Sequence, residues 1–325
     1  MRTNLNTIRQ TKGIQNLEEA MSAFGIDFGV DRVNLFTNRG GLKKITGTEA
    51  MIRTDSNSPI GIVSGKYPII QPIDKFGIFR TFAEEGLLEF VEGGTSGKMG
   101  GRVYLQARIA GTLNLEATVG DIVEQRITFM SSYDGSRANE VLITPYRLAC
   151  SNGMVISEKA SARFRVRNTR YCPSRLEEAV LVIEEAVNAY RQLDAEWMKM
   201  LATPVQDKEV GRFVEMLLPA TREVSETYVD RDGNVETIAV PETSTRTENR
   251  RQVIVETIHS GIGQAEIQGM NLWKLLNGVT CYTNHVEGER KRDRFDFLYF
   301  GGGEKLNTRA YELCTGVMAG EVSLS

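Results

Sequence analysis

Hydrophobic and polar residues alternate over short stretches in the first half of the chain, and Gly, Asn, Asp and Ser separate these stretches. Alternation with a period of two is typical of strands that bury one face, and the separating residues favour turns. We therefore expect strands at residues 33–36, 42–53, 60–63, 87–91, 102–109, 122–130 and 141–149. The sequence Tyr133-Asp-Gly-Ser predicts a hairpin turn between the last two.

One helix is expected among these strands. Pro72 suits its first position and Gly86 suits its C-terminal end. The hydrophobic residues of this segment recur at helical spacing on one face, at Ile73, Phe76, Phe79 and Phe82. An amphipathic helix accounts for that spacing, so we expect the face to lie in the core and not to form a binding surface.

Beyond residue 173 the hydrophobic period changes to three or four residues. Ser174 and Glu177 form the capping box of a long helix, which Thr203-Pro204 ends. Further helices are predicted near residues 207–218, 248–259, 271–283 and 305–318. Residues 227–240 predict an exposed hairpin that turns at Asp232-Gly233.

These patterns predict an α+β fold, with a strand-rich N-terminal half that holds one packed helix and a mostly helical C-terminal half. The polar, weakly patterned residues 1–31 are expected to form an N-terminal arm. Residues 32–172 would form a basic β-rich region, and residues 173–325 a helical region with an inserted hairpin near 223–245.

The composition is that of a soluble globular protein, because 41% of the 325 residues are hydrophobic and 25% are charged. No apolar run approaches the length of a membrane span, and the N-terminus lacks the apolar stretch of a signal peptide. Four cysteines are scattered without short spacing, which suits reduced thiols. We expect a protein of the cytoplasm, in the host cell if a phage encodes it.

The net charge of −3 conceals an uneven distribution. From Lys98 to Arg175 there are twelve basic and six acidic residues, a net charge of +6. From Leu176 to Ile258 there are nine basic and seventeen acidic residues, a net charge of −8. Such a charge asymmetry is typical of proteins that bind an anionic ligand or of subunits that pair head to tail. Chance clustering of solvated charges also produces it.

Common catalytic motifs are absent from the sequence. The stretch from Gly93 to Met99 lacks the first glycine of a phosphate-binding loop and the Ser or Thr that follows its lysine, so we expect a hairpin loop there. His259 and His285 are the only histidines, and Cys281 with His285 supplies two zinc ligands where a site needs three or four. A metal site is therefore not predicted. A metal-dependent nuclease with dispersed carboxylates remains an alternative function.

The segment from Ala162 to Tyr171 carries the strongest functional signal, because Arg163, Arg165 and Arg167 alternate with Phe164 and Val166. In a strand, alternate residues share a face and lie about 6.6 Å apart, so three guanidinium groups would form a row. Guanidinium groups bind phosphate oxygens in bidentate fashion, and a row of them suits an extended polyanion. Further candidate binding residues lie beside this strand in the predicted fold: Lys159, Arg170, Arg137 and Arg147.

Tyr133, Tyr146 and Tyr171 could offer faces on which unpaired bases stack. The alternative is a solvated edge strand, on which basic residues discourage edge-to-edge aggregation. The local charge favours nucleic-acid binding over this alternative.

Several motifs resemble domain-of-unknown-function family 932, a family of phage- and plasmid-like proteins. The resemblance rests on Ser64-Gly-Lys-Tyr-Pro-Ile-Ile-Gln-Pro, Gly101-Arg-Val-Tyr-Leu-Gln-Ala-Arg, Ser132-Tyr-Asp-Gly-Ser-Arg-Ala, Thr144-Pro-Tyr-Arg-Leu-Ala-Cys-Ser-Asn and Asn271-Leu-Trp-Lys-Leu-Leu-Asn-Gly-Val-Thr. It runs from about Val33 to Met318, and residues 223–245 depart from it as an insertion would. It implies a mobile-element context without catalytic residues. The layout is also loosely similar to phage single-strand annealing recombinases, a likeness of architecture alone.

The sequence therefore favours a binding protein over an enzyme, and it predicts binding of single-stranded DNA in phage recombination or replication. It would need no cofactor and no membrane, and it would act as a homo-oligomer, in a ring or a filament. Two other classes stay open. One is an enzyme acting on nucleic acid or nucleotides through dispersed carboxylates, and the other is a structural or host-takeover protein that binds proteins.

Overall fold

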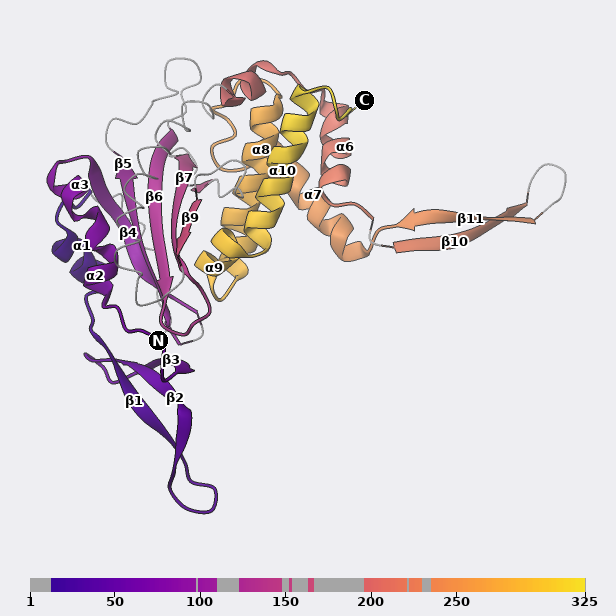
Figure 1. The fold of residues 1–325 in the computed structure, drawn as a ribbon. Coiled ribbons are helices and arrows are strands. Elements are labelled where there is room, and N and C mark those ends of the chain that lie inside the picture. The colour runs from indigo at the N-terminus through magenta and orange to yellow at the C-terminus, as the bar shows by residue number, and fades with distance from the viewer. Residues whose placement is uncertain are drawn as a thin grey trace. The chain divides into compact units, whose positions relative to one another are not determined.

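The computed structural model describes residues 13–97, 99–109, 123–147, 152–153, 163–166, 196–220, 222–229 and 235–324. Strands fill the N-terminal half and helices most of the C-terminal half, so the fold is α+β as predicted (Figure 1). The chain divides into two compact units. The first comprises Met1–Asn114, Ile122–Leu148 and Ser157–Leu193, and the second comprises Leu115–Asp121, Ala149–Ile156 and Asp194–Ser325.

Two antiparallel sheets form the first unit. The smaller has the order β1–β2–β3, and its strands are β1 (Val30–Thr37), β2 (Lys43–Arg53) and β3 (Pro59–Ser64). In the larger sheet each of four strands pairs with the next along the chain: β4 (Leu88–Ser96), β5 (Arg102–Ile109), β6 (Val123–Ser132) and β7 (Asn139–Arg147). Strand β9 (Arg163–Val166) pairs with β7. Within the described residues, the predicted strands of this half are thus present. The hairpin loop expected at residues 93–99 begins later than predicted, because β4 continues through Gly93 and Gly94 to Ser96, which pairs with Arg102 of β5.

Short helices cover one face of the larger sheet (Figure 1). They are α1 (Leu17–Ala23), α2 (Pro72–Phe76), the 3₁₀ turn η1 (Gly77–Phe79) and α3 (Arg80–Glu84). Phe76 and Phe79 are buried against Phe129 of β6 with edge-to-face rings, so the predicted hydrophobic face does lie in the core. The single predicted helix is instead an α–3₁₀–α run, closed by Gly86 with a left-handed φ of 72°.

The expectation of an N-terminal arm over residues 1–31 is wrong for its described part. Asn16 caps α1 by accepting a hydrogen bond from the Glu19 N–H. The apolar face of α1 and the chain beyond it are buried in the core, at Leu17, Ala20, Met21, Ile26, Phe28 and Val30. The few hydrophobic residues of this polar segment are spaced to meet the sheet, which composition alone does not reveal.

Side-chain hydrogen bonds fasten the smaller sheet within the first unit. The Gln71 amide bonds both the N–H and the C=O of Val30, and so acts as a further strand partner for β1. Arg32 of β1 donates to the carbonyls of Gly65 and Tyr67. These contacts hold the base of the β1–β2 hairpin, where the core residues Val30 and Met51 lie.

The second unit is mainly helical. Its elements are the two-residue strand β8 (Asn152–Gly153), α6 (Asp207–Leu217), α7 (Thr245–Ser260), α8 (Leu272–Cys281), a π-helical turn η2 (Tyr282–Glu287), a 3₁₀ turn η3 (Gly288–Arg290), α9 (Arg294–Phe300) and α10 (Gly302–Met318). Helices α6, α7, α8 and α10 agree with the predicted segments, whereas α9 was not predicted. Of the predicted long helix, residues 196–202 are helical, and its capping box at Ser174 and Glu177 lies outside the described residues.

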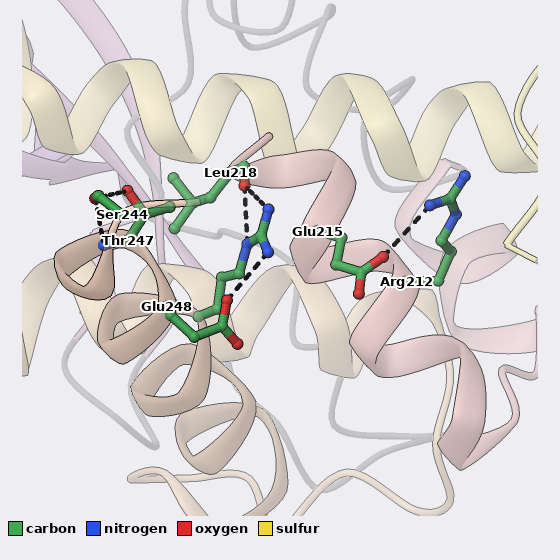
Figure 2. A network of polar contacts seen from close by, with 7 residues as sticks. Arg212, Glu215, Leu218, Ser244, Thr247 and Glu248 are labelled. Atoms are coloured by element: carbon green, nitrogen blue, oxygen red, sulfur yellow. Dashed lines mark hydrogen bonds and ion pairs between the residues drawn. The ribbon is translucent and has the colours of Figure 1, made fainter. Parts of the chain in front are cut away.

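Polar contacts cap the start of α7 and link α7 to the C-terminal end of α6 (Figure 2). Ser244 caps the start of α7 by accepting from the Thr247 N–H. From within α7, the Arg251 guanidinium donates through two nitrogens to the carbonyl of Leu218, which ends α6. A positive group at a helix C-terminus satisfies a carbonyl that has no partner within the helix.

The hairpin predicted at 227–240 is present and longer than expected. Strands β10 (Arg222–Val229) and β11 (Val235–Glu242) pair antiparallel over their whole lengths and form a sheet of their own (Figure 1). Across the described stretches of the chain, no helix is both long and apolar enough to cross a membrane.

Candidate nucleic-acid interface

Strand β9 carries two of the three arginines of the predicted row. It pairs with β7 so that Phe164 lies opposite Val141 and Arg165 lies opposite Glu140. Val141 belongs to the hydrophobic core, and Glu140 precedes it on the strand. Because neighbouring residues of a strand lie on opposite faces, the register agrees with the predicted alternation, with Arg165 on the face away from the core.

Arg165 is the member of the row whose side chain the structure describes. Its side chain is 53% exposed, while its Nε forms an ion pair with the Glu140 carboxylate, which is only 3% exposed. Within the described residues, Glu140 Oε2 accepts no hydrogen bond. A buried carboxylate needs a positive partner, so Arg165 neutralises Glu140 as well as facing solvent. This structural role was not evident from the sequence.

The remaining predicted residues are only partly brought together. Arg163 pairs with Leu142, two positions from Arg165 along β9. Arg137 lies in the β6–β7 turn beside the end of β9, where its backbone N–H and C=O both bond the Ser132 hydroxyl. Arg147 ends β7 seven residues from Glu140, about 23 Å along the strand, so it does not join this group. Arg167, Arg170 and Lys159 lie outside the described residues.

The same face of the larger sheet holds a polar network that sequence reasoning missed. Arg126 Nη1 donates to Gln106 Oε1 at 3.0 Å, and Gln106 Nε2 donates to Thr128 Oγ1 at 2.8 Å. The Arg126 guanidinium also lies 3.2 Å from the centre of the Tyr146 ring. The only sign of this network in the sequence was that Arg126 is next to the core residue Ile127, so that the two side chains lie on opposite faces of the strand.

All four members of this network are buried. On this face, Arg165 is therefore open to solvent, whereas the network is not. The stacking role predicted for two tyrosines is accordingly wrong in this conformation. Arg126 covers the Tyr146 ring, and Tyr133 is buried with its hydroxyl donating to the Ile70 carbonyl. Tyr171 lies outside the described residues.

A second polar cluster surrounds Lys75, which is 1% exposed on α2. Its Nζ donates to Ser131 Oγ at 2.7 Å and to the Ser132 carbonyl at 3.4 Å, and it lies 3.7 Å from the centre of the Tyr133 ring. A lysine next to a serine suggests a catalytic dyad. However, Ser131 is buried and donates its own proton to Asn139 Oδ1. We therefore interpret the cluster as a junction that fixes α2 on β6.

The two histidines and the described cysteines belong to the second unit. His259 Nδ1 lies 3.9 Å from Asp207, and His285 Nδ1 lies 3.9 Å from Glu289. Cys281 and Cys314 are buried thiols, and burial strongly raises the pKa of Cys314. Among the residues with described positions, no three His, Cys, Asp or Glu side chains are grouped so that they could hold a metal ion.

A comparison with protein families finds one match, to the family described as "Domain of unknown function (DUF932)", over residues 59–298. This region runs from β3 to α9. It includes the Lys75 cluster, the arginines of β9 and the β10–β11 hairpin. No curated protein and no solved structure matches the chain.

Proposed function

Since this chain belongs to the domain-of-unknown-function family DUF932, whose description gives no activity, we propose its function from the site: it binds and anneals single-stranded DNA for a phage or mobile element, in recombination or replication. The observation that carries the proposal is the exposed Arg165 on a strand of alternating arginines, within a segment of net charge +6. The context we propose is the cytoplasm of the host cell.

The chemistry of Arg165 supports this proposal. The Arg165 Nε donates to Glu140, and within the described part of the chain this side chain has no other polar partner. The two terminal nitrogens can therefore donate to a phosphate, and a guanidinium keeps its charge throughout the neutral range. Arg163 and Arg137 would extend the contact along and beyond β9, with Arg147 further away. Binding of this kind needs no cofactor.

The test is a salt titration of oligonucleotide binding, followed by fluorescence anisotropy. With about four phosphates held, log affinity should fall against log salt with a slope near −3, at roughly −0.7 per contact. Changing Arg163, Arg165 and Arg167 together to Ala should flatten the slope by about two units. If the parent binds no single strand even at low salt, the proposal fails.

The Glu140–Arg165 pair allows a sharper test in which two variants change affinity in opposite directions. Arg165→Ala should weaken binding, because a phosphate contact is lost. Glu140→Gln should strengthen binding, because it frees Arg165 from its carboxylate partner. The variant Glu140→Gln/Arg165→Ala serves as the control, since it removes the arginine without leaving a buried charge. If Glu140→Gln does not change affinity in a protein with an unchanged melting temperature, Arg165 has only a structural role.

A second candidate function is protein binding in a structural or host-takeover role. The observation that favours it is the group of exposed hydrophobic residues on the β1–β2 hairpin, Val33, Phe36, Leu42 and Ile45. Pull-down of a host protein by the parent but not by a Phe36→Ser/Leu42→Ser variant would support this candidate.

A further inference from the structure

The outer part of the β1–β2 hairpin contributes nothing to the core of its own unit. Every residue from 31 to 49 is described, and none is buried. Leu42 is 78% exposed in the loop, and Phe36 is 53% exposed on the adjoining strand. Single exposed hydrophobic residues are ordinary, but a group of them on one projecting element is typical of an interaction site.

This hairpin tip, residues 36–45, also carries an unbalanced positive charge. Arg39, Lys43 and Lys44 lie within it, and it contains no acidic residue, so its net charge is +3. All three side chains are exposed, and none has an ion-pair partner among the residues with described positions. The nearest carboxylate along β2, Glu49, is already paired with Arg32. The tip therefore presents uncompensated cations among hydrophobic side chains.

The β10–β11 hairpin has the opposite charge. Its two described strands contain Arg222 and the four acidic residues Glu223, Glu226, Glu236 and Glu242, a net charge of −3. The hairpin forms a two-stranded sheet, and Val235 is 68% exposed. A two-stranded hairpin by itself is marginally stable in water, and each strand presents unpaired backbone groups along its outer edge. The β10–β11 hairpin is therefore suited to bind a partner along an outer edge.

We propose that the hairpin tip of one copy of the chain docks on the β10–β11 hairpin of a second copy. The two surfaces carry opposite charge, and contact would bury the exposed hydrophobic side chains of the tip together with Val235 of the acceptor hairpin. A second copy is a better occupant of the tip than a nucleic acid, because Leu42, the most exposed side chain of the tip, is aliphatic and offers no face on which a base stacks, and Phe36 is its only aromatic residue. The proposal does not depend on DNA binding.

The geometry of such a contact has a consequence for assembly. It joins two different surfaces, so the copy that donates its tip keeps an unused acceptor hairpin, and the copy that receives the tip keeps its own tip unused. A head-to-tail contact of this kind propagates until it closes a ring or continues as a filament. The expected assembly therefore exceeds a dimer and grows with protein concentration.

The experiment is a charge exchange between the two hairpins, with molar mass measured by light scattering at several concentrations. The tip variant Lys43→Glu/Lys44→Glu and the acceptor variant Glu226→Lys/Glu236→Lys should each raise the dissociation constant by more than about tenfold, because like charges would face each other. Mixing the two variants in equal amounts should restore assembly, since the reversed tip of one then meets the reversed hairpin of the other.

Each possible outcome bears on the proposal. Restoration on mixing supports it and excludes misfolding or a contact within one chain as the cause of the loss. A parent that stays monomeric at low salt overturns it, as do variants that assemble like the parent or folded variants that fail to assemble when mixed. If the tip variant loses oligonucleotide binding at unchanged mass, the tip contacts nucleic acid instead.

A hydrophobic pair of variants completes the test. Leu42→Ser should weaken assembly, because it removes the most exposed apolar side chain of the tip. Ile262→Ser is the matched control, because Ile262 is also exposed but lies in the turn after α7. Equal effects of the two substitutions on molar mass would show that general surface hydrophobicity, and not the tip, drives association.

Discussion

The two units of this chain reach a stable core by different means. In the first unit, ionisable side chains lie inside and each has dedicated partners, as Lys75 has Ser131 and Glu140 has Arg165. In the second unit, the described side chains that are buried are hydrophobic or uncharged, and α8 lies so close to α7 that Gly278 is in contact with Ile258. The difference suggests that polar partners determine which elements join in the first unit, and that steric fit does so in the second.

The first prediction concerns the buried lysine of the first unit. Lys75→Ala should lower the free energy of unfolding by about 4 kcal/mol, because it leaves a cavity beneath α2 and removes a charged hydrogen bond. Lys75→Met should cost about 1 kcal/mol or less, since the stem is kept, Ser131 still bonds Asn139 and the Ser132 carbonyl still accepts from Tyr67. Denaturant unfolding measures both, with the exposed Lys66→Met as control. Equal losses for Ala and Met would show that the ammonium, and not the stem, holds the junction.

The second prediction tests steric fit in the second unit. A Cβ added at Gly278 of α8 would lie 2.4 Å from Ile258 Cγ1 and 2.5 Å from Ile258 Cα on α7. Gly278→Ala should therefore force the two helices apart and cost about 3 kcal/mol. Gly211→Ala on α6 is the matched control, because nothing lies within 4 Å of its added Cβ. Alanine has the higher helix propensity, so this control should gain about 0.5–1 kcal/mol. Thermal unfolding that shows similar melting temperatures for both variants would contradict the close approach.

The same difference between the two units determines how much of the fold could be predicted from the sequence. The helices of the second unit follow from hydrophobic period and caps, as with Asn271 before α8, whose side chain accepts from the Lys274 N–H. The strands of the first unit follow from alternation and turn residues. These signals are local, and local signals are what a sequence displays directly.

The polar partnerships could not be predicted, because they join residues far apart in the chain. Lys75 and Ser131 are 56 positions apart, and Arg165 and Glu140 are 25 apart. The alternation of arginines in β9 indicated which residues share a face. It could not indicate that a buried carboxylate lies opposite Arg165. For the same reason α1 was mistaken for an arm, since its few hydrophobic residues are buried only through contact with distant parts of the chain.

The third prediction compares two arginines of neighbouring helices that both form ion pairs (Figure 2). Arg251 is 14% exposed and bonds the Leu218 carbonyl at the end of α6. Arg212 is 58% exposed, and Glu215 is its only partner among the described residues. Arg251→Ala should cost about 2 kcal/mol, because a helix-end carbonyl loses its charged donor. Arg212→Ala should change stability by less than about 0.5 kcal/mol. Urea unfolding measures the stability of both variants. Equal unfolding midpoints would mean that other contacts hold this helix end.

The smallest expected effect concerns a charged group of the second unit that resembles those of the first. In the π-helical turn, Tyr282 and Glu287 are five residues apart and therefore lie above one another. Arg250 donates to the Tyr282 hydroxyl at 3.2 Å and to Glu287 Oε2 at 2.9 Å, and Lys291 Nζ lies 3.0 Å from Glu287 Oε1. Burial alone would raise the pKa of Glu287, but the Lys291 hydrogen bond and the Arg250 charge outweigh it. The pKa therefore lies below its ordinary value of 4.5.

A carboxylate whose pKa is lower in the folded chain stabilises the fold fully above its unfolded pKa, and this contribution is lost as the pH falls through the folded pKa. Glu287→Gln should therefore cost about 1 kcal/mol at pH 7, and the difference from the parent should shrink as the pH falls below 4.5. Glu289→Gln, which changes a carboxylate 61% exposed in the next turn, should leave stability within about 0.5 kcal/mol at every pH. Denaturant unfolding from pH 7 down to pH 3 measures all three proteins. A Glu287→Gln deficit that stays constant over this range would mean that hydrogen-bond geometry, and not charge, holds the π-helical turn against α7.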